Sequence, residues 1–251
     1  MQDDYGNVTL VNVSGIYDEQ PLFIDKLKKG GAGVIDAVSM TGTNGYCDDI
    51  AKEKFREMMK EYPTKGIHFI DGGNYHYLTL LWLSLIEEPF DLIVFDNHSD
   101  MQKPAFGDVL SCGGWIRNLV EDSGFKGKVT VVGVDKDNID KEMKELGVKF
   151  ITKQTILKKR GQQYGLENEL IDKCWTGKRP VYISVDKTNW NQGIMSVDEL
   201  FAIIEDTFEM RKVIGMDICG EMDEAVNSEF GSIYNEINQA VNMRFLKFRI
   251  S

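Results

Sequence analysis

Several features that mark common protein classes are missing from this sequence. Its longest apolar stretch, Tyr77 to Ile86, is too short to cross a bilayer. The first residues, Met-Gln-Asp-Asp-Tyr-Gly, lack the basic and apolar regions of a signal peptide. The four cysteines are widely spaced and form no Cys-x-x-Cys pair, which argues against a zinc finger or a thioredoxin-like site. We therefore expect a cytoplasmic protein with reduced thiols and no membrane partner.

The usual nucleotide and nucleophile motifs are also missing. There is no GxxxxGK[ST] loop, no strand-GxGxxG-helix unit and no GxSxG elbow. Cys112-Gly113-Gly114-Trp115 could line a pocket, but a thiol nucleophile needs a basic partner and none is evident. The sequence therefore disfavours a P-loop enzyme, a dinucleotide-binding fold and a serine hydrolase.

Positive charge is scarce relative to negative charge. The 251 residues carry 29 Lys and Arg against 40 Asp and Glu, a net charge of −11. This balance disfavours nucleic acid or an anionic membrane as a partner and mildly favours cationic ligands. The length and a hydrophobic share of 42% fit one large α/β domain or two small ones.

Short runs rich in Val and Ile alternate with segments of helical periodicity. Most of the runs lack polar alternation, as expected of strands buried on both faces of a parallel sheet. The predicted strands are Val8–Val13, Ile67–Ile70, Asp91–Phe95, Val129–Val134, Val148–Ile151, Val181–Val185 and Val213–Ile218. The predicted helices are Asp48–Tyr62, Tyr75–Glu87, Trp115–Asp122, Asp137–Leu146, Leu166–Cys174, Ser196–Lys212 and Ser228–Met243.

This alternation predicts an α/β fold, a three-layer α/β/α sandwich around a mainly parallel sheet. No proline- or serine-rich linker and no repeat divides the chain, so we expect one domain over residues 1–251. Ser196-Val197-Asp198-Glu199 is a capping-box signature. The Gly-rich region from Lys29 to Cys47 is expected to be a long loop that shapes a ligand site.

Polar residues at the ends of the predicted strands are the candidates for chemistry, because ligands bind beyond the carboxyl ends of parallel strands. One strand ends in Asp96-Asn97-His98-Ser99-Asp100. In an extended segment, Asp96, His98 and Asp100 would project to one side, and carboxylate with imidazole suits Mn, Zn or Fe(II). The alternative, a helix-capping turn with a surface histidine, is the weaker interpretation.

Three other strand ends add to this group. Asp186 follows a buried strand, where an aspartate alone would be a turn residue. His76 follows Gly72-Gly73 and is either a metal ligand, a general base or a structural hydrogen-bonding group. Asp217 and Glu221 end the last strand as ligand-binding carboxylates or, equally, as turn residues.

In order and content, these motifs resemble those of the arginase/deacetylase (ureohydrolase) superfamily. That superfamily has a Gly-Gly-x-His, an Asp-x-His-x-Asp and a Ser-x-Asp-x-Asp element. They stand here as Gly72-Gly73-Asn74-Tyr75-His76, Asp96-Asn97-His98-Ser99-Asp100 and Ser184-Val185-Asp186-Lys187-Thr188. The resemblance implies an arginase-like α/β/α domain, and metal ligands among Asp96, His98, Asp100, Asp186 and His76.

The sequence departs from the two-metal pattern of the arginase-like enzymes at two positions. Thr188 stands where the last motif has its second aspartate, and Tyr75 stands where the first motif has its histidine, with His76 one residue later. The second metal pocket is thus degenerate, and the resemblance implies one ion rather than two. The resemblance favours Mn, with Zn, Fe or Ni as alternatives.

The resemblance implies a hydrolase that cleaves a non-peptide C–N bond of an amidine, guanidine or amide with metal-activated water. His76 would transfer protons, and Asp100 would act as a fourth ligand or a catalytic group that orients the others. Asn74, Thr188 and Glu221 would contact a small-molecule substrate. The acidic composition mildly favours a cationic one. A homo-oligomer is compatible with the sequence. The rival interpretation, motivated by Thr188 and Tyr75, is a metal-binding protein that has lost hydrolase activity and serves in binding or regulation.

Overall fold

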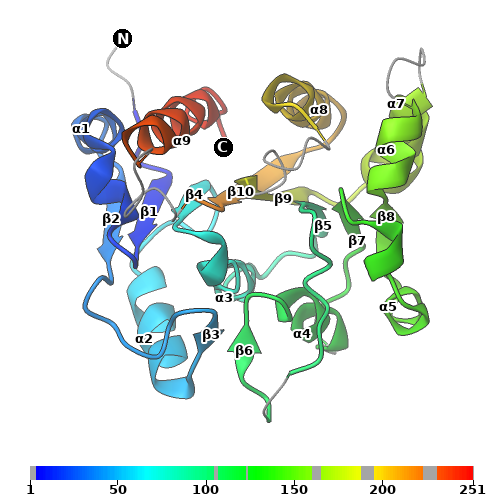
Figure 1. Cartoon of the computed structure of the whole chain (residues 1–251), viewed down its shortest axis with the longest axis horizontal. Helices are drawn as coiled ribbons and strands as arrows, with labels where there is room; N and C mark the ends of the chain where they lie inside the picture. Colours follow the sequence, from blue (N-terminus) through cyan, green and yellow to red (C-terminus); the bar gives the residue numbers. More distant parts are fainter. Residues whose placement is uncertain are drawn as a thin grey trace.

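An eight-stranded parallel sheet, in the order β2-β1-β4-β10-β9-β5-β7-β8, runs through the protein (Figure 1). The computed structural model describes residues 4–104, 107–122, 124–159, 165–187, 195–222 and 231–250. The strands of this sheet are β1 (Val8–Asn12), β2 (Gly33–Asp36), β4 (Ile67–Ile70), β5 (Asp91–Phe95), β7 (Val129–Val132), β8 (Lys149–Ile151), β9 (Val181–Asp186) and β10 (Val213–Cys219).

The central strands are apolar on both faces, as the sequence predicts. Every residue of β1, β4, β5, β7, β9 and β10 is buried. The prediction of a loop from Lys29 to Cys47 is wrong in part, because Gly33–Asp36 forms the edge strand β2 beside β1. Only one residue of this short strand is buried, so it lacks the apolar run by which the other strands are recognised.

Helices cover both faces of the sheet. In Figure 1, α1, α9 and α8 lie on one side of the sheet and α2, α3 and α4 on the other. The helices are α1 (Pro21–Lys29), α2 (Asp49–Met59), α3 (Leu78–Leu83), α4 (Trp115–Glu121), α5 (Lys141–Glu145), α6 (Lys153–Lys159), α7 (Gly165–Leu170), α8 (Val197–Met210) and α9 (Gly231–Phe245), with short turns at η1 (Ile16–Glu19), η2 (Gly73–Tyr75), η3 (Lys136–Asn138) and the π-helical η4 (Ile171–Trp175).

Two separate apolar cores result. One packs α1, α8 and α9 against one face of the sheet and includes Phe23, Phe201 and Phe245. The other packs α2, α3 and α4 against the opposite face and includes Phe55 and Trp82. The fold is therefore the predicted three-layer α/β/α sandwich.

Local signals in the sequence account for several helix ends. Ser196 and Glu199 form the predicted capping box at the start of α8. Asp140 caps α5 through the Met143 N–H, so the helix expected over Asp137–Leu146 is shorter and is preceded by the 3-10 turn η3. The helix expected over Tyr75–Glu87 is also shorter, since α3 covers only Leu78–Leu83 and follows the 3-10 turn η2. The expected start of the last helix at Ser228 lies outside the described residues. No helix in the described ranges has the length and apolar character needed to cross a membrane.

The two strands at the centre of the sheet come late in the chain. β9 and β10 pair with each other and separate β4 from β5. This is where the order of the strands reverses, and in parallel α/β sheets such a crevice at the carboxyl ends holds the ligand. A small antiparallel ribbon of β3 (Tyr46–Cys47) and β6 (Leu110–Ser111) flanks this edge.

Candidate metal centre

Side chains from three strand ends meet at the carboxyl edge of the sheet. Phe95 of β5 pairs with Val185 of β9, so Asp96 and Asp186 follow as neighbours. After β4, the turn at Gly72 and Gly73 leads into η2, which delivers His76 to the same place. The predicted convergence of Asp96, Asp186 and an imidazole is therefore a property of parallel strand order and of one tight turn.

The imidazole of His76 lies at the centre of three carboxylates. Its Nδ1 is 3.3 Å from Asp96 Oδ2, 3.0 Å from Asp100 Oδ2 and 3.9 Å from Asp186 Oδ2. Ligand atoms of His76, Asp96 and Asp186 all lie within 4.8 Å of one another, and so do those of Asp96, His98 and Asp100. Atoms that bind one ion at about 2.1 Å stand roughly 3 to 3.5 Å apart, so the spacing fits ligands of a single cation.

Burial and unsatisfied atoms support this fit. The exposed fraction is 0% for Asp96, 1% for His76, 3% for Asp186 and 5% for Asp100. His76 Nδ1 and Asp96 Oδ2 are buried and face each other without hydrogen-bond geometry. Neither Asp96 nor Asp100 pairs with a lysine or arginine in the part of the chain that the structure describes. Buried carboxylates without a cation are unfavourable, so the residues present fit a divalent metal.

The backbone of Asp100 is held in an unusual conformation. Its φ of 48° is the left-handed region, which non-glycine residues rarely adopt. Two hydrogen bonds hold it there: its carbonyl accepts from the Ile116 N–H at 2.9 Å, and its Oδ2 accepts from Trp115 Nε1 at 2.6 Å. The same Oδ2 lies 3.0 Å from His76 Nδ1. Strain of this kind collects at functional sites, and here it turns the carboxylate inward.

The pKa values reflect how crowded the carboxylates are. Burial raises the pKa of Asp100 to about 7, with the negative charge of Asp96 adding to the effect. Burial also raises the pKa of Asp96, but His76 and His98 outweigh it and bring that pKa to about 2. Burial lowers the pKa of His76, yet Asp100 and Asp96 outweigh it and hold the pKa well above its ordinary value. A cation bound among these groups would compete with the protons that they take up.

His98 occupies the outer side of the site. Its Nδ1 is 3.2 Å from Asp96 Oδ1, while 60% of its side chain is exposed. Its backbone N–H also donates to Asp96 Oδ1, at 2.8 Å. The carboxylate of Asp96 raises the pKa of His98 to about 9. His98 thus reaches the site from the solvent side, whereas His76 reaches it from the core.

A cavity of about 530 Å³ opens onto these residues. The β3–β6 ribbon forms one wall, through Tyr46 and Ser111, and the predicted pocket residues Cys112 and Gly113 follow it. The residues that line the cavity are Gly45, Tyr46, Gly73, Asn74, His76, His98, Asp100, Gln102, Ser111, Cys112, Gly113 and Asp186. Asn74, predicted from the sequence as a substrate contact, is among them.

Glu221 lies elsewhere, in a buried polar cluster. Its carboxylate pairs with Lys187 Nζ and accepts from Gln20 Nε2 at 2.9 Å and from Asn242 Nδ2 at 2.7 Å. Lys187 Nζ also donates to Asn242 Oδ1 at 2.9 Å. Glu221 is not among the residues that line the cavity. Thr188 lies outside the described residues.

Asp217 lies behind His76 rather than in the cavity. It accepts a hydrogen bond from Ser184 Oγ at 2.7 Å, and the same Oγ lies 2.9 Å from His76 Nε2. Burial raises the pKa of Asp217 to about 6. Ser184 and Trp115 were not singled out in the sequence as site residues. Ser184 had one available signal, since it is the serine of the third motif, whereas nothing near Trp115 in the sequence marks its bond to Asp100.

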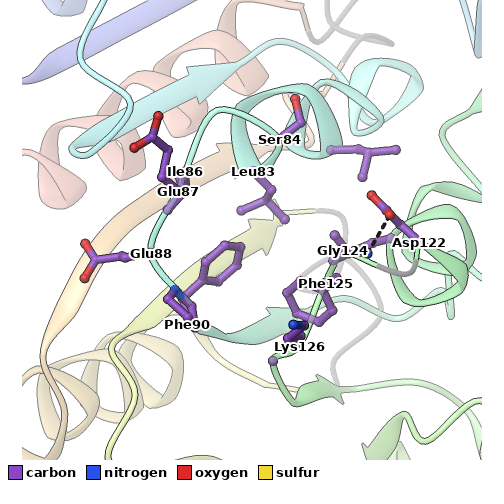
Figure 2. A pocket seen from close by; sticks show the side chains of 14 residues that line it. Leu83, Ser84, Ile86, Glu87, Glu88, Phe90, Asp122, Gly124, Phe125 and Lys126 are labelled. Atoms are coloured by element: carbon purple, nitrogen blue, oxygen red, sulfur yellow. Dashed lines mark hydrogen bonds between the residues drawn. The ribbon is translucent and has the colours of Figure 1, made fainter.

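A second cavity, of about 420 Å³, lies at the opposite end of the strands (Figure 2). Phe90 and Phe125 form its apolar floor, and Glu87, Glu88 and Asp122 lie around it. Phe90 directly precedes β5, so this cavity opens at the amino ends of the parallel strands. It is therefore remote from Asp96 and the converging carboxylates.

Comparison with known proteins places the site in a wider context. The model of the arginase family matches residues 38–188. An uncharacterised protein of Thermotoga maritima is 28% identical over 225 residues, which is 86% of this chain and 80% of that protein.

Solved structures of related folds cover nearly the whole chain. Formimidoylglutamase from Bacillus subtilis aligns with a TM-score of 0.65 and 15% identity, covering 96% of this chain and 85% of that one. Trypanosoma cruzi formiminoglutamase with Mn²⁺ aligns with a TM-score of 0.66 and 14% identity, covering 98% and 94%. Proclavaminate amidino hydrolase from Streptomyces clavuligerus aligns at 0.62 and 17%, covering 98% and 93%. At these identities the likeness establishes the fold.

Proposed function

Because the chain belongs to the arginase family, we propose that it is a metal-dependent hydrolase of a non-peptide C–N bond in an amidine, guanidine or amide. The observation that carries the proposal is the convergence of His76 Nδ1 with the buried carboxylates of Asp96, Asp100 and Asp186 at the floor of an open cavity. The spacing of these atoms supports a resident divalent ion, with Mn²⁺ as the first candidate, and so does the lack of lysine or arginine partners for Asp96 and Asp100 among the described residues.

Each residue has a distinct task in this proposal. Asp96, Asp186 and His76 would hold the ion, which when bound would supply Lewis-acid polarisation and a lower pKa for water. Trp115 fixes the carboxylate of Asp100, so that group stays beside the ligands and can accept or hold a proton there. The side chains of Asp96, His76 and Asp186 are themselves nearly fully buried, which strengthens the electrostatic interactions among them.

One ion rather than two is the stoichiometry we expect. The two groups of candidate ligands share Asp96, so they describe overlapping positions around one carboxylate. His98 would complete the coordination from the solvent side, where its exposure leaves room for substrate exchange. Tyr75, which stands where the family motif has a histidine, also indicates one ion rather than two.

The charge of the cavity favours a neutral or cationic substrate. No lysine or arginine is among the described residues that line it. The segments 188–194 and 223–230, which follow β9 and β10 in the chain, contain no lysine or arginine in their sequences either. A guanidinium, amidinium or amine would therefore meet complementary charge, and the Asn74 and Gln102 amides offer hydrogen bonds to the rest of the molecule.

Elemental analysis of the purified protein, followed by activity assays, tests this proposal. We expect about one metal equivalent per chain, and hydrolysis of at least one compound among arginine, agmatine, formiminoglutamate and acetylated polyamines with Mn, Zn, Fe or Ni supplied. Asp96→Asn should lose metal and activity together. The matched control is Asp206→Asn, on the exposed side of α8, which should keep both. Metal retained in full by Asp96→Asn would refute the site.

A binding or regulatory role without turnover is the second candidate, and the position of Glu221 favours it. That carboxylate, predicted to contact substrate, is neutralised by Lys187 in a buried cluster instead. Stoichiometric metal with no turnover of any compound in the panel would support this role. Turnover that depends on the metal would exclude it.

A further inference from the structure

A chain of buried polar groups runs from the metal site back into the sheet. Ser184 on β9 lies between His76 and Asp217 on β10, with its Oγ 2.9 Å from His76 Nε2 and 2.7 Å from Asp217 Oδ1. Ser184 and Asp217 have no exposed surface, and only 1% of His76 is exposed. These groups are shielded from bulk solvent, so the protons that they carry themselves decide the direction of each hydrogen bond.

The direction follows from counting protons. A serine hydroxyl has one proton, and Ser184 donates it to the Asp217 carboxylate. Its oxygen can then only accept from His76, so the proton of a neutral His76 must sit on Nε2. This leaves the lone pair on Nδ1, the atom that faces Asp96, Asp100 and Asp186.

We infer that Ser184 and Asp217 are positioning residues that fix His76 in the Nε2–H tautomer and thereby make its Nδ1 a metal ligand rather than a general base. The inference rests on the proposed metal site and deepens it. Partners of this type orient a ligating imidazole and raise its basicity, and their loss typically weakens metal affinity by about 10- to 100-fold.

The hydrogen bond between Ser184 and Asp217 depends on the pairing of β9 with β10. β9 and β10 pair in register with Ser184 directly opposite Asp217, which places the hydroxyl beside the carboxylate. Tyr182, two residues earlier on the same face of β9, also interacts with Asp217, and its hydroxyl lies 2.9 Å from His68 Nδ1. The hydrogen bond from Ser184 to Oδ1 therefore holds the Asp217 carboxylate, while its Oδ2 has no hydrogen-bond partner among the described residues.

Affinity for Mn²⁺ alone, measured by competition with a chelator, tests the inference. Ser184→Ala and Asp217→Leu interrupt the hydrogen bonds that link His76 to Asp217, and we expect each to raise the Kd for Mn²⁺ by about 10- to 100-fold. Ser184→Thr keeps a hydroxyl and should restore affinity close to wild type. The matched control is Thr130→Val, which removes another buried strand hydroxyl, bonded to the Lys173 carbonyl at 3.0 Å, and should leave the Kd unchanged.

Proton placement is the second readout. In Zn²⁺-loaded protein, long-range ¹H–¹⁵N spectra should show the His76 proton on Nε2 and the metal on Nδ1. A proton on Nδ1, or an unchanged Kd in folded Ser184→Ala, would overturn the inference while leaving the metal site standing. If Asp217→Leu does not fold, Ser184→Ala decides alone. Wild-type protein that binds neither Mn²⁺ nor Zn²⁺ would refute the proposed function and this inference together.

Discussion

The histidine inside β4 should contribute a loss of folding stability in mild acid. His68 has no exposed surface, stacks on Trp82 with ring centroids 4.0 Å apart, and uses both ring nitrogens, towards the Tyr182 hydroxyl and the Pro63 carbonyl. Burial lowers the pKa of His68 to about 4, although the bond to Pro63 opposes this shift. The folded protein therefore keeps this imidazole neutral at a pH where the unfolded chain takes up a proton.

The size of the effect follows from the two pKa values. An unfolded histidine titrates near a pKa of about 6.5, so stability is fully present above that pH and falls as the pH drops towards about 4. The expected contribution is a loss of about 2 kcal/mol in the free energy of unfolding between pH 7.5 and pH 5. The loss reaches about 3 kcal/mol below pH 4 and then stops growing.

Urea unfolding at pH 7.5 and pH 5, with EDTA present, measures this dependence. His68→Gln keeps hydrogen-bonding groups but cannot titrate, so its stability should fall by about 2 kcal/mol less than that of the wild type over this interval. Tyr182→Phe serves as the control, because it removes the hydroxyl partner but keeps the buried imidazole and hence the pH dependence. An identical pH dependence in His68→Gln and wild type would refute the reasoning.

Three further predictions concern the two buried polar clusters. Lys187→Met and Glu221→Gln should each lower the free energy of unfolding by about 3 to 5 kcal/mol, because each leaves an unpaired buried charge. In urea unfolding, the double variant should lose clearly less than the sum of the two single losses. Additive losses would argue against the ion pair. Trp115→Phe removes the donor to Asp100 and should weaken Mn²⁺ binding by roughly 10-fold in chelator competition, so an unchanged Kd would contradict that role. Mn²⁺ affinity should fall as the pH drops from 8 to 6, because the metal must displace protons from His76, whose pKa is raised, and from Asp100, whose pKa is about 7. Calorimetry in two buffers should detect the release of protons on binding. An affinity that does not change with pH would refute this prediction.

Much of the fold was predictable because strands that are buried on both faces appear in the sequence as nearly continuous apolar runs. Runs such as Asp91–Phe95 and Val213–Cys219 are almost wholly apolar, and helical segments between them require parallel crossovers. Gly33–Asp36 has no such apolar run, because an edge strand needs little apolar surface. The ribbon strands, at two residues each, are too short for any periodic signal.

The candidate site was predictable to the extent that strand order determines it. Asp96 and Asp186 follow buried strands, and knowing that such strands run parallel is enough to place both residues on one edge. The partner of Glu221 was not predictable, because it depends on β10 lying beside β9 and on the left-handed turn at Gly220, whose φ is 81°. The inward turn of Asp100 depends in the same way on a left-handed backbone that nothing in its neighbouring residues specifies.

The position of β9 and β10 has a consequence for how the chain must fold during synthesis. Until residues 181–219 have been synthesised, β2-β1-β4 and β5-β7-β8 are two half-sheets that share no strand, and β4 and β5 are unpaired edges. Such edges recruit other chains, so polypeptides that end before β9 should aggregate instead of forming a smaller native unit. The last strands to be made join the two halves, and the same event brings His76 from the β4 half, Asp96 from the β5 half and Asp186 of β9 together.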